Sequence, residues 1–422
     1  MRSLERIEEP AGKLVKRTTF LNARIFDGVR SEYVDESVVV VEGERIVAVD
    51  RTPGASISGD VVDAAGKTLM PGLIDAHCHV LGSSLKVTDV ETQPLTYVAG
   101  YASRMLGHAL DCGFTTVRDV GGGDAGIARA VAEGLIRGPR VFFAGRALSM
   151  TGGHGDFRDP FSGVGACGCS ADGRVALVVD GEDAVRAAAR EELRRGAHCI
   201  KIMLSGGVLS PADPIWMDQF TDREVIAAVE EAARRRKYVA AHCHPPSSIA
   251  RAAKLGVRTI EHATLIDESS AAAVKSAGAY VVPTTVIARA LLDDAKEGLL
   301  PGWMSEKLAE VSDQSLRGLE IMDRFALKIG FGTDLLGHLH THQTREFTIR
   351  REVQSAASIL RSATSVNAEI VMEPHLGKIQ PGCCADILIV DGDPLEDIGV
   401  LARDGRCLSA IMKAGEFVKL SR

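Results

Sequence analysis

Short apolar segments alternate with amphipathic helical stretches through the middle of the chain, and this alternation restricts the possible folds more than any other feature. The apolar segments are typical of buried strands and comprise residues 73–80, 114–120, 140–145, 199–205, 238–244, 259–263, 280–284 and 329–334. Stretches between them, such as 183–195, 222–236 and 269–276, carry apolar residues at i, i+3 and i+4. This order predicts an α/β fold, a (β/α)8 TIM barrel. A doubly wound open sheet is the alternative architecture.

Both ends of the chain have the alternating pattern of short antiparallel strands. These strand-like segments are residues 20–28, 37–41 and 45–49 near the N-terminus, and 385–392 and 407–412 near the C-terminus. We interpret the two ends as one small β-sandwich domain with a structural role, formed from residues 1–68 and 375–422. The barrel would then occupy residues 69–374.

Charge and hydropathy narrow the possible partners. The chain has 49 Lys and Arg residues against 56 Asp and Glu, so its net charge is −7. A negative net charge argues against nucleic acid or an anionic membrane surface as the main partner. Residues 1–6 lack the apolar region of a signal peptide, and no uninterrupted apolar run reaches membrane-spanning length. We therefore expect a cytoplasmic protein.

Residues suited to metal binding recur where the predicted strands end. His77 and His79 lie two apart on the first strand, so their imidazoles point to the same face. Later strands end with Lys201 on the fourth, His242 on the fifth, His262 on the sixth and Asp334 on the eighth. In such barrels, the carboxyl ends of the strands form the functional mouth. Each residue alone has a structural explanation, but together they predict a metal centre.

Lys201 lies in the apolar segment Cys-Ile-Lys-Ile-Met, where burial of a charged ammonium group is costly. A structural salt bridge inside the barrel is one explanation. The other is that the neutral amine has taken up carbon dioxide to form a carbamate, whose two oxygens can bridge two metal ions. Imidazole and carboxylate ligands suit zinc and allow other divalent ions.

In the second interpretation the predicted ligands divide between two divalent ions. His77 and His79 would hold the first ion, His242 and His262 the second, and Asp334 the first ion and its water. Asp75 lies two residues before His77 on the same face, where it is a candidate acceptor for a ligand imidazole N–H. A polar residue in the layered barrel core is the alternative for Asp75.

Taken together, these motifs resemble the amidohydrolase superfamily. The resemblance rests on residues 72–79, Lys201, His242, 261–263 and 332–334, and on residues 376–386, which look like that family's return into its β-domain. Residues 151–155 and 201–208 are similar to the imidazolonepropionase-like branch, which includes bacterial Xaa-Pro dipeptidases and carboxypeptidase-like enzymes. Residues 354–364 look closest to bacterial amidohydrolases that hydrolyse ochratoxin A.

The resemblance implies a binuclear metal-dependent hydrolase of amide bonds next to a free carboxylate, with conversion of ochratoxin A to ochratoxin alpha and phenylalanine as the implied reaction. A hydroxide shared by two cations would form near neutral pH. Asp334 would act as general base and then general acid, passing the proton of the water to the leaving amine. A neutral His154, in a Gly-rich loop after the third strand, would donate to the developing oxyanion.

Further residues are candidates for substrate contacts. His244 shares a face with His242 and projects past the strand end, and the backbone of Ser205, Gly206 and Gly207 could let a substrate approach closely. The histidines of the His338-x-His340-x-His342 series are expected in a solvent-exposed loop, with one of them available to line the mouth. Residues 95–105 and 299–322 exceed a minimal barrel connection and could be lids or subunit contacts.

Two other functions remain open at this point. The same metal centre can support hydrolysis of cyclic amides, lactones or phosphotriesters, because the loops that select a substrate are not decoded by spacing. A non-catalytic assembly protein on the same scaffold would be expected to lose metal ligands, whereas all six positions are filled here. The resemblance also implies a homo-oligomer, such as an octamer, acting on a small amide or dipeptide-like molecule.

Overall fold

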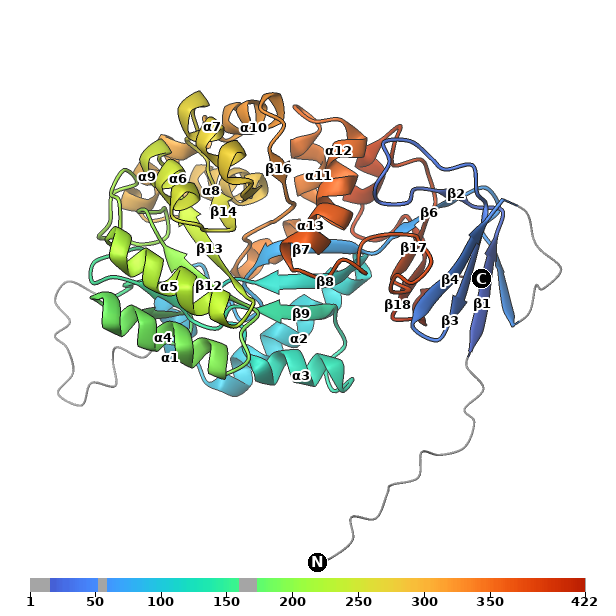
Figure 1. The fold of residues 1–422 in the computed structure, drawn as a ribbon, viewed down its shortest axis with the longest axis horizontal. Helices are drawn as coiled ribbons and strands as arrows, with labels where there is room; N and C mark the ends of the chain where they lie inside the picture. Colours follow the sequence, from blue (N-terminus) through green and yellow to red (C-terminus); the bar gives the residue numbers. More distant parts are fainter. Residues whose placement is uncertain (1–15, 52–58, 159–172, 422) are drawn as a thin grey trace, which may run out of the picture.

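The computed structural model describes residues 16–51, 59–158 and 173–421. Helices surround a group of parallel strands, and strands from both ends of the chain lie together at one side of the molecule (Figure 1). None of the helices in the described part is long and apolar enough to cross a membrane.

The parallel strands belong to two sheets. One sheet has the order β7-β8-β9, with β7 at Leu73–Cys78, β8 at Phe114–Asp119 and β9 at Arg140–Phe143. The other has the order β11-β10-β12-β13-β14-β15-β16. Its strands are β10 (Ala147–Ser149), β11 (Ala176–Val178), β12 (Cys199–Met203), β13 (Tyr238–Cys243), β14 (Thr259–His262), β15 (Tyr280–Val282) and β16 (Lys328–Ile329).

Backbone hydrogen bonds connect both outer strands of the three-stranded sheet, β7 and β9, to the seven-stranded sheet. The Ala76 N–H of β7 donates to the Phe331 carbonyl beyond β16, and the His198 N–H before β12 donates to the Phe143 carbonyl of β9, both at 2.8 Å. Each of the eight predicted segments overlaps an observed strand, and β10 and β11 are additional. The last predicted strand is much shorter than expected, because the chain leaves the regular ladder after β16 to form the segment that carries Asp334.

The helices follow the strands in the predicted alternation. They are α1 (Val87–Thr92), α2 (Leu95–Asp111), α3 (Ala125–Ala132), α4 (Glu182–Arg194), α5 (Asp222–Arg234), α6 (Pro246–Lys254), α7 (Glu268–Ala277), α8 (Thr285–Lys296), α9 (Gly302–Ser312), α10 (Ser315–Arg324), α11 (Arg345–Arg350), α12 (Ala356–Arg361) and α13 (Asn367–Ile370). The local sequence determines where several of these helices begin. At α5, for example, the Thr221 hydroxyl accepts from the Glu224 N–H while the Glu224 carboxylate accepts from the Thr221 N–H.

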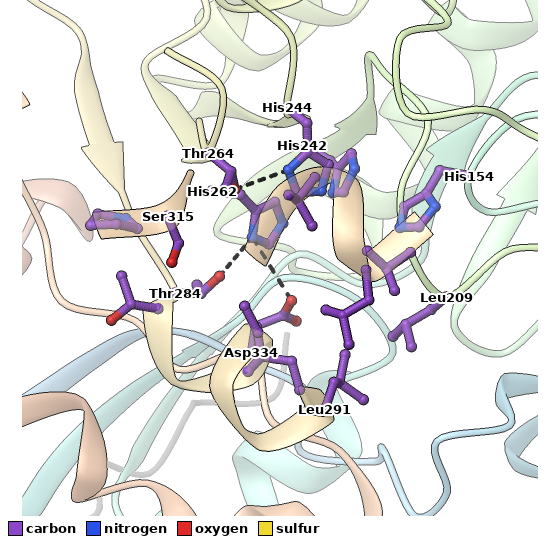
Figure 2. A pocket seen from close by; sticks show the side chains of 17 residues that line it. His154, Leu209, His242, His244, His262, Thr264, Thr284, Leu291, Ser315 and Asp334 are labelled. Atoms are coloured by element: carbon purple, nitrogen blue, oxygen red, sulfur yellow. Dashed lines mark hydrogen bonds and ion pairs between the residues drawn. The ribbon is translucent and has the colours of Figure 1, made fainter. Parts of the chain in front are cut away.

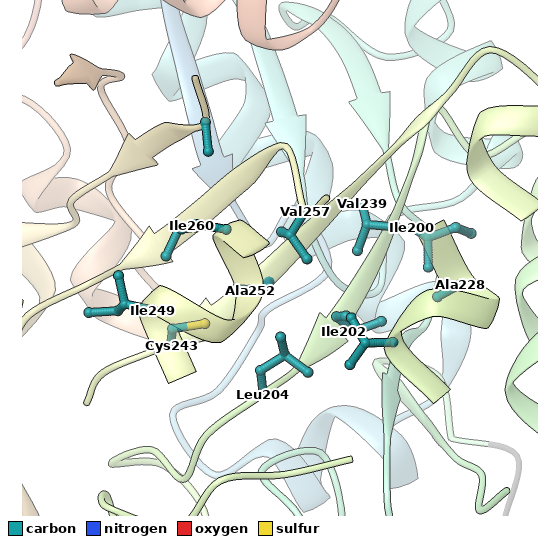
Figure 3. Packing of buried hydrophobic residues seen from close by; sticks show 14 of the residues in the cluster. Ile200, Ile202, Leu204, Ala228, Val239, Cys243, Ile249, Ala252, Val257 and Ile260 are labelled. Carbon is teal, nitrogen blue, oxygen red and sulfur yellow. The ribbon is translucent and has the colours of Figure 1, made fainter. Parts of the chain in front are cut away.

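Alternation along β12 decides which side chains reach the interior of the strands. Ile200 and Ile202 point outward into a cluster with Val239 and Ile260 of the neighbouring strands and with the covering helices (Figure 3). Because successive side chains on a strand point to opposite faces, Lys201 between them points inward. All five residues of β12 are buried.

Strands from the two chain ends form two further sheets. The first has the order β4-β3-β1-β5, from β1 (Arg17–Leu21), β3 (Val38–Glu42), β4 (Arg45–Asp50) and β5 (Asp60–Asp63). The second has the order β19-β18-β17-β6-β2, from β2 (Arg24–Ile25), β6 (Thr68–Pro71), β17 (Ile387–Val390), β18 (Leu408–Lys413) and β19 (Glu416–Leu420). One apolar cluster joins both sheets and includes Phe20, Val39, Leu69, Ile389 and Met412.

Candidate metal centre

Three ligand-type side chains meet where β7 ends and where the chain continues beyond β16. The Nε2 atoms of His77 and His79 lie 3.3 and 3.0 Å from Oδ1 of Asp334. Within the described residues, these three side chains form the one group of three or more His, Cys, Asp or Glu whose ligand atoms all lie within 4.8 Å of one another. Two imidazole nitrogens and a carboxylate oxygen at this spacing are suited to bind a divalent cation.

The two histidines of this group are held through their other ring nitrogen. The Nδ1–H of His77 donates to Oε2 of Glu261 at 2.7 Å, and the Nδ1–H of His79 donates to the Gly121 carbonyl at 2.9 Å. Such acceptors fix the tautomer and the orientation of a ligand histidine. Both Nε2 atoms are therefore directed toward Asp334.

Glu261 contacts the candidate metal group through His77, a position that the sequence analysis did not assign to it. It is fully buried and accepts two hydrogen bonds of 2.9 Å from Nη2 of Arg118, which is also fully buried. Burial alone would raise the pKa of Glu261, but Arg118 and His77 outweigh it and lower that pKa. The signal available in the sequence was that Glu261 immediately precedes His262. Adjacent side chains face opposite ways only on a regular strand, so at an irregular strand end both can face the interior.

Asp75 does not have the predicted role of an acceptor for a ligand imidazole. Its Oδ1 accepts from the main-chain N–H of His77, and its Oδ2 accepts from the Thr333 hydroxyl at 2.6 Å and the Gln343 amide at 2.8 Å. Asp75 thus connects the end of β7 to the segment that carries Asp334. Glu261 supplies the imidazole contact instead.

His242 and His262 lie on adjacent strands beside this group, with ring centroids 4.6 Å apart (Figure 2). Nε2 of His242 is 3.1 Å from the Gly206 carbonyl, and Nδ1 of His262 is 2.8 Å from the Thr284 hydroxyl. Burial lowers the pKa of both rings well below the usual value, which favours neutral imidazole. Neutral imidazole is the form that binds metals.

Lys201 is buried near His242, His262 and Asp334. Burial lowers the pKa of its amine, against the opposing influence of Glu261 and Asp334. In the described part of the chain, no hydrogen bond or ion pair involves the Lys201 side chain. The predicted alternative of a structural salt bridge therefore has no partner among these residues, and an unpaired ammonium group is the costly form at this depth.

The backbone is strained at two of the candidate ligands. His262 and Asp334 have φ values of 66° and 56°, in the left-handed region that few non-glycine residues adopt. Conformations of this kind cost on the order of 1–3 kcal/mol and persist where the surrounding structure holds them, commonly at functional sites. At Asp334 the holding contact is a 2.8 Å hydrogen bond from its N–H to the His77 carbonyl.

His154 reaches the same region from the loop after β10. Its ring stacks on that of His242, with centroids 4.2 Å apart. Its Nδ1 lies 2.6 Å from the Ser210 hydroxyl and 3.3 Å from Oδ2 of Asp213. The opposite nitrogen, Nε2, is therefore the one available to the cavity that His154 lines.

The predicted contact residues Ser205, Gly206 and Gly207 lie beside this cavity and do not line it. A Cβ at Gly206 would lie 2.0 Å from the Pro214 carbonyl oxygen, and a Cβ at Gly207 would lie 2.2 Å from Cε1 of His154. Protein atoms thus occupy the space beside these glycines. The Ser205 hydroxyl accepts from the His244 N–H at 3.0 Å.

The cavity has a polar side and an aliphatic side. The polar side includes His154, His242, His244, His262 and Asp334 (Figure 2). Nδ1 of His244 is 3.0 Å from the Thr264 hydroxyl, and burial lowers the pKa of His244 to about 3. The aliphatic side consists of Val208 and Leu209, Ile287 and Leu291 of α8, and Leu308 and Val311 of α9. Residues 299–322, which were predicted as a lid or subunit contact, thus contribute α9 to the aliphatic side of the cavity.

The His338-x-His340-x-His342 series forms a short 3-10 helix and does not join the metal-type group. His338 is exposed and pairs with Asp294 at 3.0 Å. The expectation of solvent-exposed histidines is wrong for His340, which is buried with Nδ1 2.7 Å from the Tyr101 hydroxyl. Tyr101 belongs to α2, which the sequence pattern did not place against this segment.

The chain is similar to several known proteins. A sequence model of the amidohydrolase family matches residues 68–418. Ochratoxinase from Aspergillus niger is 33% identical over 372 residues, covering 83% of this chain and 75% of the relative. A solved prolidase complexed with N-methylphosphonate-L-proline has a TM-score of 0.93 and 44% identity, covering 96% of this chain and 100% of the other. A Xaa-Pro dipeptidase with bound methionine has a TM-score of 0.85 and 30% identity, covering 96% and 100%.

The matched region contains every strand end that carries a candidate ligand, from His77 to Asp334. Divalent metals are the cofactors that this family generally uses, and the convergent imidazole and carboxylate groups fit such ions. Hydrolysis of amide bonds is therefore the chemistry of this chain, which belongs to the amidohydrolase family.

Proposed function

We propose that the chain is a binuclear metal-dependent hydrolase that cleaves an amide bond next to a free carboxylate, as dipeptidases and carboxypeptidases do. The observation that carries the proposal is the convergence of His77 Nε2, His79 Nε2 and Asp334 Oδ1 at the strand ends. The neutral rings of His242 and His262 beside them would complete a second site.

Six residues would hold the two ions, which we take to be zinc from the ligand types. His77, His79 and Asp334 would hold one ion, His242 and His262 the other, and a carbamate on Lys201 would bridge them. When bound, such ions acidify a water molecule and polarise a carbonyl group. A carbamate would also remove the cost of an unpaired ammonium group at Lys201.

The chain's own residues would carry the proton and orient the substrate. Burial raises the pKa of Asp334, but His77 and His79 outweigh it and lower that pKa, so the carboxylate is ionised and able to accept a proton. Asp334 would then return the proton to the leaving amine. Nε2 of His154 would contact the carbonyl oxygen where negative charge develops.

The cavity and the relatives together suggest the substrate class. No lysine or arginine occurs among the described residues that line the cavity, so a substrate carboxylate would rely on Nε2 of His244 and on the bound cations. The aliphatic side would accommodate an apolar or aromatic side chain. Prolidase, dipeptidase and ochratoxinase relatives support an N-acyl amino acid, with ochratoxin A yielding phenylalanine as the specific proposal.

Metal analysis and hydrolysis assays test the function together. We expect about two divalent ions per chain, loss of activity on chelation and recovery on readdition of zinc, with release of a free amino acid from ochratoxin A, N-acyl amino acids or dipeptides. Methyl esters of the same compounds, which lack the free carboxylate, should be poor substrates. Two ions without amide turnover would move the substrate to lactones or other esters. Absence of metal from protein produced with metal supplied would contradict the proposal.

Gly207→Ala is expected to lower kcat/KM by about 100-fold at unchanged metal content, because the new Cβ displaces the His154 ring and a shift of about 1 Å in a catalytic group has that effect. Steady-state kinetics with elemental analysis would measure it. Gly100→Ala is the matched control, since no atom beyond its chain neighbours and the adjacent helix backbone lies within 4 Å of the Cβ position at this helical glycine. Activity of Gly207→Ala equal to that of Gly100→Ala would show that the position of His154 is unimportant.

The proposed function includes the domain architecture and the assembly expected from the sequence. Residues 69–374 would form a closed (β/α)8 barrel, supported by the backbone hydrogen bonds from β7 and β9 to the seven-stranded sheet. Residues 1–68 and 375–422 would form the β-sandwich, supported by the shared apolar cluster. The assembly would be a homo-oligomer, for which the sedimentation coefficient is the direct measurement.

A further inference from the structure

Asp213 is a buried carboxylate that the proposed reaction leaves without a role. It lies in the loop between β12 and α5 and has no exposed surface. Burial raises the pKa of Asp213, but contacts with His154, Ser210 and Lys307 outweigh it, and the pKa is lowered overall. A charged carboxylate therefore stays in the interior within reach of the candidate catalytic histidine.

The contacts of Asp213 hold His154 at two points. Oδ2 of Asp213 is 3.3 Å from Nδ1 of the His154 ring and accepts from the Gly207 N–H at 3.1 Å. The Gln219 amide nitrogen lies 3.4 Å from the same Oδ2, while the Gln219 carbonyl oxygen accepts from the main-chain N–H of His154 at 3.0 Å. Both the ring and the backbone of His154 are thus fixed by one connected group.

Lys307 ties this group to the wall of the cavity. It extends from α9, its side chain is only 12% exposed, and Nζ lies 3.6 Å from Oδ1 of Asp213. Nζ donates to the carbonyls of Gly207 at 2.8 Å, Ser210 at 2.6 Å and Asp213. Because α9 also contributes Leu308 and Val311 to the aliphatic side, one lysine connects the apolar wall to the loop that orients His154.

We propose that Asp213 and Lys307 are positioning residues, which hold the His154 ring against His242 so that its Nε2 atom faces the scissile carbonyl. The inference rests on the proposed amide hydrolysis. Asp213 would accept from Nδ1–H of the ring. A ring that also presents Nε2–H to the carbonyl oxygen is then doubly protonated, in place of the neutral ring expected from the sequence. Lys307 holds Asp213 and the loop backbone. A residue that only stabilises the loop would affect folding and substrate binding, whereas a positioning residue affects the chemical step through His154.

A double-mutant cycle separates these two roles. The substrate is whichever of ochratoxin A, an N-acyl amino acid or a dipeptide the metal-loaded wild type hydrolyses fastest. We expect Asp213→Asn to lower kcat about 10- to 100-fold with KM changed less than threefold. In a His154→Ala background, the same substitution should change kcat less than threefold. Lys307→Met should reproduce the pattern with a smaller loss.

Controls keep folding and loop effects apart from positioning. Asp218→Asn removes a carboxylate from the same loop that accepts from the hydroxyls of Ser247 and Ser248 and does not touch His154, so its kcat should match wild type. Lys296→Met removes an exposed lysine from α8 that pairs with Asp293. Metal content and thermal midpoint are measured for every variant, and Lys307→Met provides the cycle if Asp213→Asn fails to fold.

The outcomes are distinct. Equal losses from Asp213→Asn in the wild-type and His154→Ala backgrounds, or a loss no greater than that of Asp218→Asn, would overturn the positioning role and leave amide hydrolysis intact. A metal-loaded wild type that hydrolyses none of the three amides would overturn the proposed function, and the positioning role with it.

Discussion

Replacement of Asp334 by asparagine is expected to lower kcat by about 10³-fold while the enzyme keeps its metal. The carboxylate is the group that would accept the proton from water and return it to the leaving amine, and an amide cannot do either. His77 and His79 retain their Nε2 atoms, and the asparagine carbonyl oxygen can occupy the place of Oδ1. Asparagine also tolerates the left-handed backbone at this position, so the fold should be preserved.

Steady-state kinetics and elemental analysis on the same preparation measure both parts of this expectation. Asp294→Asn is the matched control, because Asp294 also contacts a histidine, His338, but lies outside the candidate metal group. Its kcat should stay within about twofold of wild type. Turnover by Asp334→Asn within tenfold of wild type would exclude Asp334 as the proton carrier. Loss of both metal and activity would make it a ligand without showing a catalytic role.

Glu261→Gln is expected to destabilise the protein by about 3–5 kcal/mol, because the substitution leaves Arg118 charged and without its ionic partner in the interior. Both side chains are fully buried, and the pair is joined by two hydrogen bonds of 2.9 Å. The loss should appear as a lower urea midpoint in metal-free protein. His77 also loses a charged acceptor, so the affinity for the first metal ion should fall about 10- to 100-fold.

Glu268→Gln provides the comparison for this second expectation. Glu268 pairs with Arg324 at 2.5 Å, but both side chains are more than half exposed, and an exposed pair contributes less than about 1 kcal/mol. Competition with a chromophoric chelator would measure the metal affinity of each variant. If the urea midpoint of Glu261→Gln equals that of Glu268→Gln, the buried charge of Arg118 is compensated by another partner or in some other way.

Sequence alone placed each predicted strand over an observed one, although most of residues 329–334 lie outside β16, because this information lies within single strands. The spacing of His77 and His79 determines a common face on any regular strand, and the inward direction of Lys201 follows from its apolar neighbours Ile200 and Ile202. These arguments need no knowledge of which strands are neighbours. The candidate ligands were accessible to sequence analysis for that reason.

Contacts between distant segments were not accessible in the same way. Glu261 meets His77 and Arg118 across the interior, and which acceptor reaches the His77 ring depends on strand register and tilt. Spacing suggested Asp75, which is close in sequence, as one of two alternatives, but Asp75 accepts from the main chain of His77 and not from its ring. Burial of His340 depends in the same way on Tyr101 of α2. The left-handed backbone at Asp334 likewise follows from its hydrogen bond to His77.

The pairing of β6 with β17 has a consequence for synthesis on the ribosome. Thr68 to Pro71 pair antiparallel with Val390 to Ile387, so two strands of one sheet emerge at opposite ends of translation. At about 5–20 residues per second, the intervening chain takes on the order of tens of seconds to appear. During that time Leu69 and Met70, which are fully buried in the finished protein, lack the strand that covers them. Burial of these two side chains is therefore completed only after β17 has been synthesised.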